Sequence, residues 1–102
     1  MSDNELIEKY QKNGDNSLVG ELYERYTDFV FFVCMKYFKN EEDSREAVMQ
    51  IFEKLFTDLK NHKIDRFKSW LHVVARNHCL LTLRSDKYKR KFQYEYEKDQ
   101  SV

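Results

Sequence analysis

The chain has 102 residues, which is enough for one domain with a single hydrophobic core but not for two. Hydrophobic residues make up 41% of it, a content that excludes a disordered chain. The sequence contains no proline and only two glycines, so it is poor in turn-forming residues and favours long helices.

The formal net charge is zero, but the charge is unevenly distributed along the chain. Residues 1–59 hold 7 Lys/Arg and 13 Asp/Glu, a net charge of −6. Residues 60–91 hold 10 Lys/Arg and 2 Asp/Glu (net +8), and residues 92–102 hold 1 and 3 (net −2). The basic part can therefore bind a polyanion while the acidic part binds a different partner.

Two helices are expected before residue 40. Ser2 and Glu5 have the spacing of a capping box, so a short helix should run to about residue 12, with Gly14 as its stop. Asp15 or Asn16 then caps a second helix, which has apolar residues on more than one face. Such a helix must pack against several neighbours.

A third helix should begin after Asn40, which is followed by three acidic residues that the helix dipole favours there. The same acidic residues, with Glu46, could be read as metal ligands, but their position at a helix start favours the capping explanation. The apolar residues of this helix form two parallel rows: Ala47, Val48, Ile51, Phe52, Leu55, Phe56 and Leu59.

A polar connector over residues 60–65 leads to the fourth helix, which Asp65 could cap. Its expected inward positions are Phe67, Trp70, Leu71, Val74, His78 and Leu81. The segment from Tyr88 onward should extend this helix. The sequence therefore predicts an all-α bundle of three principal helices plus a short N-terminal one. Residues 1–91 form the domain, and residues 92–102 form a charged tail or the start of a linker.

Catalysis, cofactors and metal binding are not expected. The three histidines lack metal-binding spacing, and no phosphate-binding loop or nucleophile motif appears. Cys34 and Cys79 lie 45 residues apart and are expected to pack as small hydrophobic side chains. With no signal-peptide pattern and no apolar run long enough to span a membrane, the expected setting is a reducing cytoplasm.

The basic segment is the strongest candidate for a binding surface. Four of its cations, Arg76, Arg84, Lys87 and Lys91, can share one helix face about 20 Å long, which suits the phosphates of a nucleic acid. A merely solvated helix face is equally compatible with this composition. Asn77, placed in an apolar stripe, either satisfies backbone groups or reads a ligand through its paired donor and acceptor.

Residues 70–84 carry a resemblance to a known family. They read Trp-Leu-His-Val-Val-Ala-Arg-Asn as far as Asn77 and close with Leu83 and Arg84. This resembles the W-L-x-x-[IV]-A-R-N…L-R signature of sigma-70 region 2, in the version of the compact extracytoplasmic-function (ECF) bacterial RNA polymerase sigma factors. Blocks at residues 6–26 and 43–55 also resemble that family in order and spacing, so the resemblance covers roughly residues 5–90.

The resemblance implies a transcription initiation module without enzymatic activity. In such domains the second block binds the clamp helices of the polymerase β′ subunit, which here implies Asp43, Glu46, Met49, Gln50 and Glu53. The connector Asn61–Arg66 and the fourth helix would recognise the promoter −10 element and hold its melted non-template strand. The implied DNA-binding residues are Lys63, Arg66, Lys68, Arg76, Asn77, Arg84, Lys87 and Arg90. An anti-sigma factor is a further partner of this family.

Three positions depart from the family pattern. Met49 stands where glutamine is usual, Ala47 where leucine is usual, and Leu81 where an acidic or polar residue is usual. The first two bear on the polymerase contact. Two competing hypotheses remain open, namely a general single-stranded nucleic-acid binder and a helical adaptor that mimics region 2. No helix-turn-helix segment for the −35 element is encoded in these residues.

Overall fold

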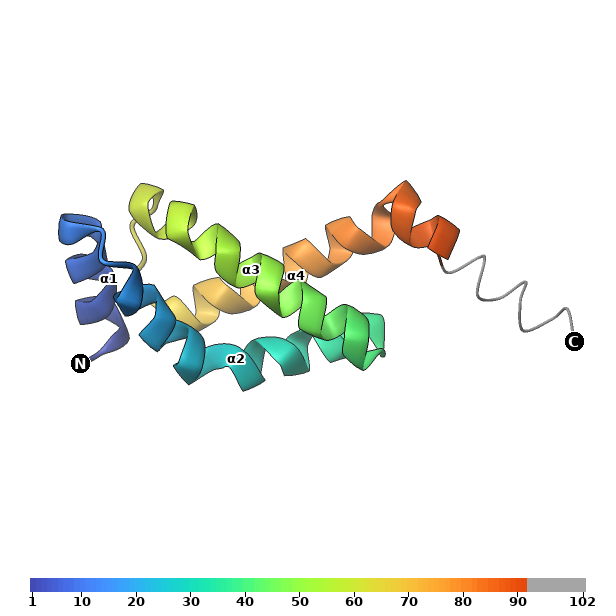
Figure 1. Ribbon diagram of the computed structural model, residues 1–102, viewed down its shortest axis with the longest axis horizontal. Helices are drawn as coiled ribbons and strands as arrows, with labels where there is room; N and C mark the ends of the chain where they lie inside the picture. Colours follow the sequence, from blue (N-terminus) through green and yellow to red (C-terminus); the bar gives the residue numbers. More distant parts are fainter. Residues whose placement is uncertain (92–102) are drawn as a thin grey trace, which may run out of the picture.

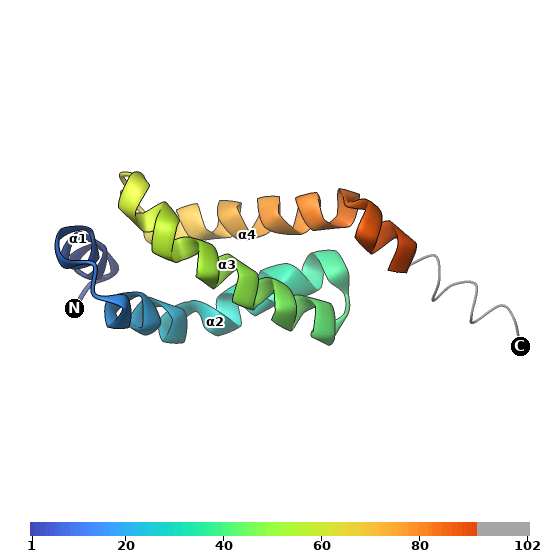
Figure 2. The ribbon, with the colours of Figure 1, turned by 45° about the horizontal axis from the view of Figure 1, so that its top comes forward.

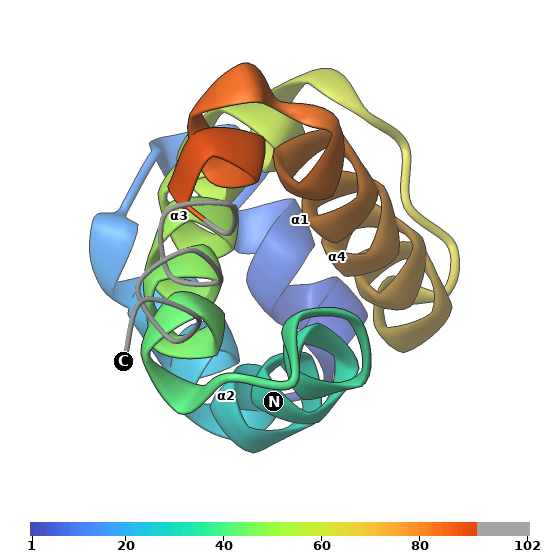
Figure 3. The same ribbon diagram turned by 90° about the vertical axis from the view of Figure 1, so that its right-hand side faces the viewer.

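The computed structural model describes residues 1–91 (Figure 1). They form α1 (Asp3–Asn13), α2 (Asn16–Phe38), α3 (Glu41–Asn61) and α4 (Phe67–Arg84), followed by helical residues 86–91. The described part contains no strand, so the all-α prediction is confirmed. The three long helices surround a shared core and α1 lies across one end of the bundle (Figures 2 and 3).

The predicted start signals of the first three helices are confirmed. The Ser2 hydroxyl accepts a hydrogen bond from the Glu5 N–H at 3.2 Å, and the Glu5 carboxylate accepts one from the Ser2 N–H. Gly14 ends α1 with φ at 67°, a left-handed conformation that glycine adopts at low cost. Asp15 and Asn40 cap α2 and α3 through their side chains. Local capping chemistry therefore sets these boundaries.

The start of α4 differs from the prediction. Arg66 rather than Asp65 occupies the N-cap position, and its side chain makes no capping hydrogen bond. The Asp65 backbone carbonyl instead accepts a hydrogen bond from the Asn4 side chain at 3.2 Å. This contact ties the connector before α4 to α1. Because the two residues are far apart in the sequence, local capping signals could not predict it.

The end of α3 is also fixed by α1. The Gln11 side-chain amide donates hydrogen bonds to the backbone carbonyls of Leu59 and His62, at 2.8 and 3.1 Å. The Tyr10 hydroxyl donates to the Phe56 carbonyl at 2.7 Å. The Leu59 carbonyl lies in the last turn of α3, where carbonyls have no partner within the helix, so Gln11 satisfies it. The short N-terminal helix therefore positions the connector that leads into α4.

The core lies where α2 meets the other three helices, as its wide apolar surface predicted. Tyr23 packs edge-on against Phe52 of α3 with ring centroids 4.4 Å apart, and Tyr26 packs against Phe67 of α4 at 5.2 Å. One predicted row member of α3, Phe56, is 37% exposed rather than buried. No helix in the described part of the chain is long and apolar enough to cross a membrane.

The inward face of α4 is rotated relative to the prediction. Its buried residues are Phe67, Leu71, Ala75 and Cys79, which recur at steps of four. Leu81, predicted to point inward, is 65% exposed. The buried row thus includes small side chains, at positions 75 and 79, and not only bulky ones. The other predicted inward residues, Trp70, Val74 and His78, are partly buried.

The two cysteines meet within this core. Cys34 of α2 and Cys79 of α4 are free thiols and fully buried. A hydrogen bond between the two thiols, together with burial, raises the pKa of Cys34. The prediction that both pack as small hydrophobic side chains is confirmed.

Candidate functional site

The exposed side of α3 brings together most of the residues predicted to bind a protein partner. Glu46, Met49, Gln50 and Glu53 are spaced by three, one and three residues, so they lie on one helix face. All four are exposed, and Met49 is 59% exposed. This face lies opposite the buried row that anchors α3 in the core. We name these four residues the α3 face.

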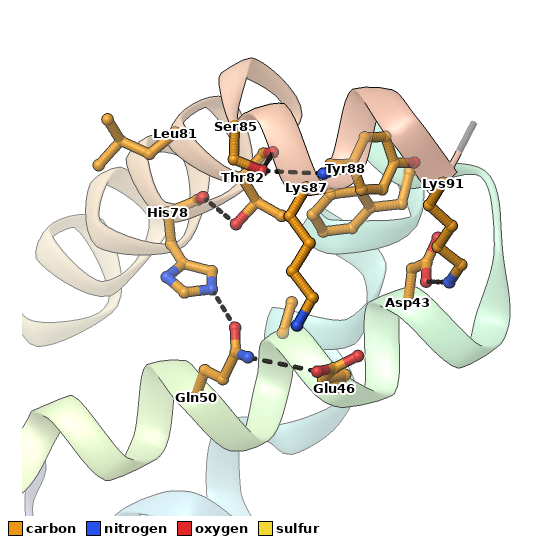
Figure 4. A pocket seen from close by; sticks show the side chains of 12 residues that line it. Asp43, Glu46, Gln50, His78, Leu81, Thr82, Ser85, Lys87, Tyr88 and Lys91 are labelled. Atoms are coloured by element: carbon orange, nitrogen blue, oxygen red, sulfur yellow. Dashed lines mark hydrogen bonds and ion pairs between the residues drawn. The ribbon is translucent and has the colours of Figure 1, made fainter. Parts of the chain in front are cut away.

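Asp43 differs from the other four predicted residues. Its carboxylate forms an ion pair with Lys91 at 2.7 Å, and only 14% of its side chain is exposed. Lys91 belongs to the helical residues 86–91, which fold back toward the start of α3 (Figure 4). Asp43 therefore fixes the position of this segment rather than presenting a free charge. The family departure at Ala47 is also internal, because Ala47 is only 3% exposed.

The nucleic-acid residues predicted on α4 lie on its exposed face. Arg76, Asn77 and Arg84 are exposed, and Asn77 has two exposed apolar neighbours one turn away, Val73 and Leu81. Asn77 therefore lies in an apolar stripe, as predicted, but this stripe is exposed rather than buried. Within the described residues its amide makes no hydrogen bond, so both its donor and its acceptor face solvent. We name Arg76, Asn77 and Arg84 the α4 face.

The remaining predicted cations do not form one straight row with the α4 face. Lys63 and Arg66 lie exposed in the connector, and Lys87 and Arg90 lie beyond the end of α4. The Lys68 ammonium lies 5.1 Å from the centre of the Phe29 ring, which holds it against α2 by a cation–π contact. The basic charge is therefore distributed over the connector, α4 and the segment that follows.

Ser85 breaks the predicted continuous helix. Its hydroxyl donates to the Thr82 carbonyl at 2.7 Å and accepts a hydrogen bond from the Tyr88 N–H at 3.2 Å. The backbone at Ser85 is extended, with φ at −70° and ψ at 144°. One serine thus ends α4 and caps the next helical segment, and serine is a favoured N-cap residue. Tyr88 then packs against Phe38 of α2, with ring centroids 5.7 Å apart.

One cross-helix contact was not predicted from the sequence. His78 Nε2 lies 2.9 Å from Gln50 Oε1, which joins α4 to the α3 face (Figure 4). Burial, and then the positive charge of Lys54, lower the pKa of His78. The neutral imidazole donates from Nε2, because an amide oxygen can only accept. Sequence spacing could show that His78 points toward the bundle but not which residue of α3 it meets.

A pocket of about 600 Å³ opens beside this contact (Figure 4). Its walls come from α3, α4 and residues 86–91, and its base includes the side chains of Phe38 and Ala47. The other residues that line it are Asp43, Glu46, Gln50, His78, Leu81, Thr82, Ser85, Lys87, Tyr88 and Lys91. It therefore contains residues from both the acidic and the basic parts of the sequence.

Trp70 and the connector lie at the other end of α4. The Trp70 ring is partly buried, with its centroid 6.0 Å from that of Phe67 and 6.2 Å from that of His62. This agrees with the prediction of a packing role for Trp70. It also places His62, at the start of the connector, against the first turn of α4.

Comparison with known proteins identifies the fold. Residues 22–88 match the model of the Sigma-70 region 2 family. The chain belongs to the sigma-70 region 2 family. The region 2 match begins within α2 and extends past the break at Ser85, so it covers both faces.

A curated relative gives the same assignment. The region 2 chain is 22% identical over 80 residues to the ECF RNA polymerase sigma factor SigW of Bacillus subtilis (strain 168). The alignment covers 78% of this chain and 43% of that protein, so the chain spans less than half of the relative's length. No solved structure matches. The predicted family, an ECF-type sigma-70 region 2 domain, is confirmed.

Proposed function

We propose that this region 2 domain is a transcription initiation module that binds core RNA polymerase through the α3 face and the promoter −10 element through α4 and its connector. The observation that carries the proposal is the separation of two exposed faces within one matched domain. One face presents Glu46 and Glu53, and the other presents Arg76 and Arg84 around Asn77. Opposite charges on different helices suit two different partners.

The α4 face has the chemistry expected for a single strand of DNA. Arg76 and Arg84 can neutralise phosphates, which supplies affinity without sequence preference. The exposed Asn77 amide offers a donor and an acceptor to the edge of an unstacked base, which can supply preference. The connector Asn61–Arg66, fixed by α1, would form the side of the site next to the first turn of α4.

Glu46→Lys tests the polymerase half. Reversing a charge at the centre of the α3 face should raise the dissociation constant for core RNA polymerase roughly tenfold or more, because an oppositely charged contact becomes repulsive. The measurement is an equilibrium binding titration without DNA. Glu8→Lys is the matched control, because Glu8 is equally an exposed helical glutamate but lies on α1.

The same titration separates the proposal from its competitor. A general single-stranded nucleic-acid binder is favoured by one observation, the exposed Met49 at a position where the family usually carries glutamine. Such a protein would show no measurable affinity for core polymerase, and Glu46→Lys would change nothing. Wild-type polymerase affinity in Glu46→Lys would likewise remove the α3 face from the interface.

A further inference from the structure

A pocket lies between α3, α4 and residues 86–91, and most of its lining residues belong to neither the α3 face nor the α4 face. We propose that it receives one large apolar side chain from a basic helix of core RNA polymerase, so that the pocket-lining residues Leu81 and Tyr88 belong to the polymerase interface. This inference rests on the proposed docking through the α3 face. It extends that interface across the junction between α3 and α4.

The pocket is held open by contacts on each of its sides. The His78–Gln50 hydrogen bond, at 2.9 Å, fixes the distance between α4 and α3 at one end. At the other end the Lys91–Asp43 ion pair, at 2.7 Å, holds residues 86–91 against the start of α3. Ser85 sets the bend between these two ends. A binding site that exists before its partner arrives loses less conformational entropy on binding.

The lining favours an apolar side chain. Phe38, Ala47 and Tyr88 contribute carbon surface, and Leu81, which is 65% exposed, also lines the pocket. A volume of about 600 Å³ lies in the range of pockets that bind ligands, and it exceeds what a single side chain needs. Because Leu81 is exposed, a partner that covers it gains hydrophobic free energy. Anchors of this kind carry much of the affinity of protein interfaces.

The charges around the pocket favour basic residues beside that anchor. Among the described residues, Arg45 pairs with Glu41 and Lys91 pairs with Asp43. Glu46 lines the pocket, and Glu53 lies less than one α3 turn beyond the lining residue Gln50. Neither glutamate forms an ion pair within the described part. Lys87 reaches from residues 86–91 across the pocket toward α3 (Figure 4). The partner's cations should therefore lie along α3, away from Lys87.

Leu81 is an exposed leucine rather than a buried one. An exposed leucine adds nothing to the core of this domain, whereas it completes the apolar lining of the pocket.

Leu81→Asn tests the inference in the full chain of 102 residues, with core RNA polymerase as the probe and no DNA present. Because Leu81 is exposed, the variant should keep the wild-type circular dichroism spectrum while its dissociation constant rises about tenfold. Val73→Asn is the matched control, because Val73 is an exposed apolar residue of α4 that does not line the pocket. It should bind like the wild type.

Glu46→Lys, measured in parallel, separates the failure of this inference from the failure of the proposed function. If Glu46→Lys weakens binding and Leu81→Asn does not, the α3 face stands and the pocket contact is wrong. If neither variant weakens binding, the proposed docking itself is wrong, and the pocket contact with it. A rise in affinity on Leu81→Asn would mean that the chain itself, in cis or as a second copy, covers the pocket, which would also overturn the inference.

Discussion

The α3 face and the α4 face differ in how their structure arises from the sequence. Glu46, Met49, Gln50 and Glu53 lie on one regular helix whose buried row consists mostly of large apolar residues, so their shared exposure follows from spacing alone. The α4 face depends on small buried residues, on the break at Ser85 and on packing against α2. A face on a well-patterned helix is set locally, whereas a face next to a bend is set by the rest of the fold.

The largest expected effect is on stability, and it distinguishes the residues of α4 that the structure buries from those that the sequence predicted to be buried. Leu71→Ala should lower the free energy of unfolding by about 2–5 kcal/mol, because Leu71 is fully buried and its loss leaves a cavity. Leu81→Ala should change it by no more than about 0.5 kcal/mol, because Leu81 is mainly exposed. Urea unfolding of both variants measures the difference. Equal decreases in the free energy of unfolding for the two variants would mean that Leu81 belongs to the core.

The next effect divides the α4 face into two roles. Asn77→Ala should reduce discrimination between −10 oligonucleotides by about 1–3 kcal/mol at one base position, because it removes the amide that reads a base edge. Arg84→Ala should weaken binding to all sequences alike. It should also lower the magnitude of the slope of log affinity against log salt concentration by about 1, because one phosphate contact is lost. A salt-titrated binding series on single-stranded variants measures both. If both substitutions scaled every oligonucleotide equally, the base-reading role of Asn77 would be wrong.

The smallest effect concerns the junction between the two faces. The lowered pKa of His78 means that folding disfavours its protonation, so this residue stabilises the fold above the ordinary histidine pKa. That contribution is lost as the pH falls from about 6.5 through the lower pKa of the folded state. Unfolding free energies between pH 7 and pH 5 should therefore fall more steeply in the wild type than in His78→Gln. Identical slopes would contradict the neutral, buried state of His78.

Much of the fold could be predicted because its signals are local. Ser2, Asp15 and Asn40 cap their helices as expected, and Gly14 ends α1. Asp65 is not the N-cap of α4, and its carbonyl accepts a hydrogen bond from Asn4, a contact between distant segments. Leu81 is exposed, and the buried row of α4 passes through the small residues Ala75 and Cys79 instead.

The candidate site divides in the same way. Four of the five residues expected on α3 share one exposed face, but the engagement of Asp43 with Lys91 could not be foreseen across 48 residues. The spacing of four cations predicts that they share one helix face, but Ser85 ends α4 between Arg84 and Lys87 through its hydrogen bonds. The pocket and the His78–Gln50 contact depend on where α3 and α4 cross, which the spacing of residues along each helix does not predict.

The central claim is that α3 binds polymerase while α4 binds DNA, and one crossed measurement tests it most directly. Glu46→Lys and Arg84→Ala are each titrated against core RNA polymerase and against a single-stranded −10 oligonucleotide. The account predicts that Glu46→Lys weakens only the polymerase complex and that Arg84→Ala weakens only the DNA complex. It is contradicted if either variant weakens both complexes equally, or if the two variants exchange their effects.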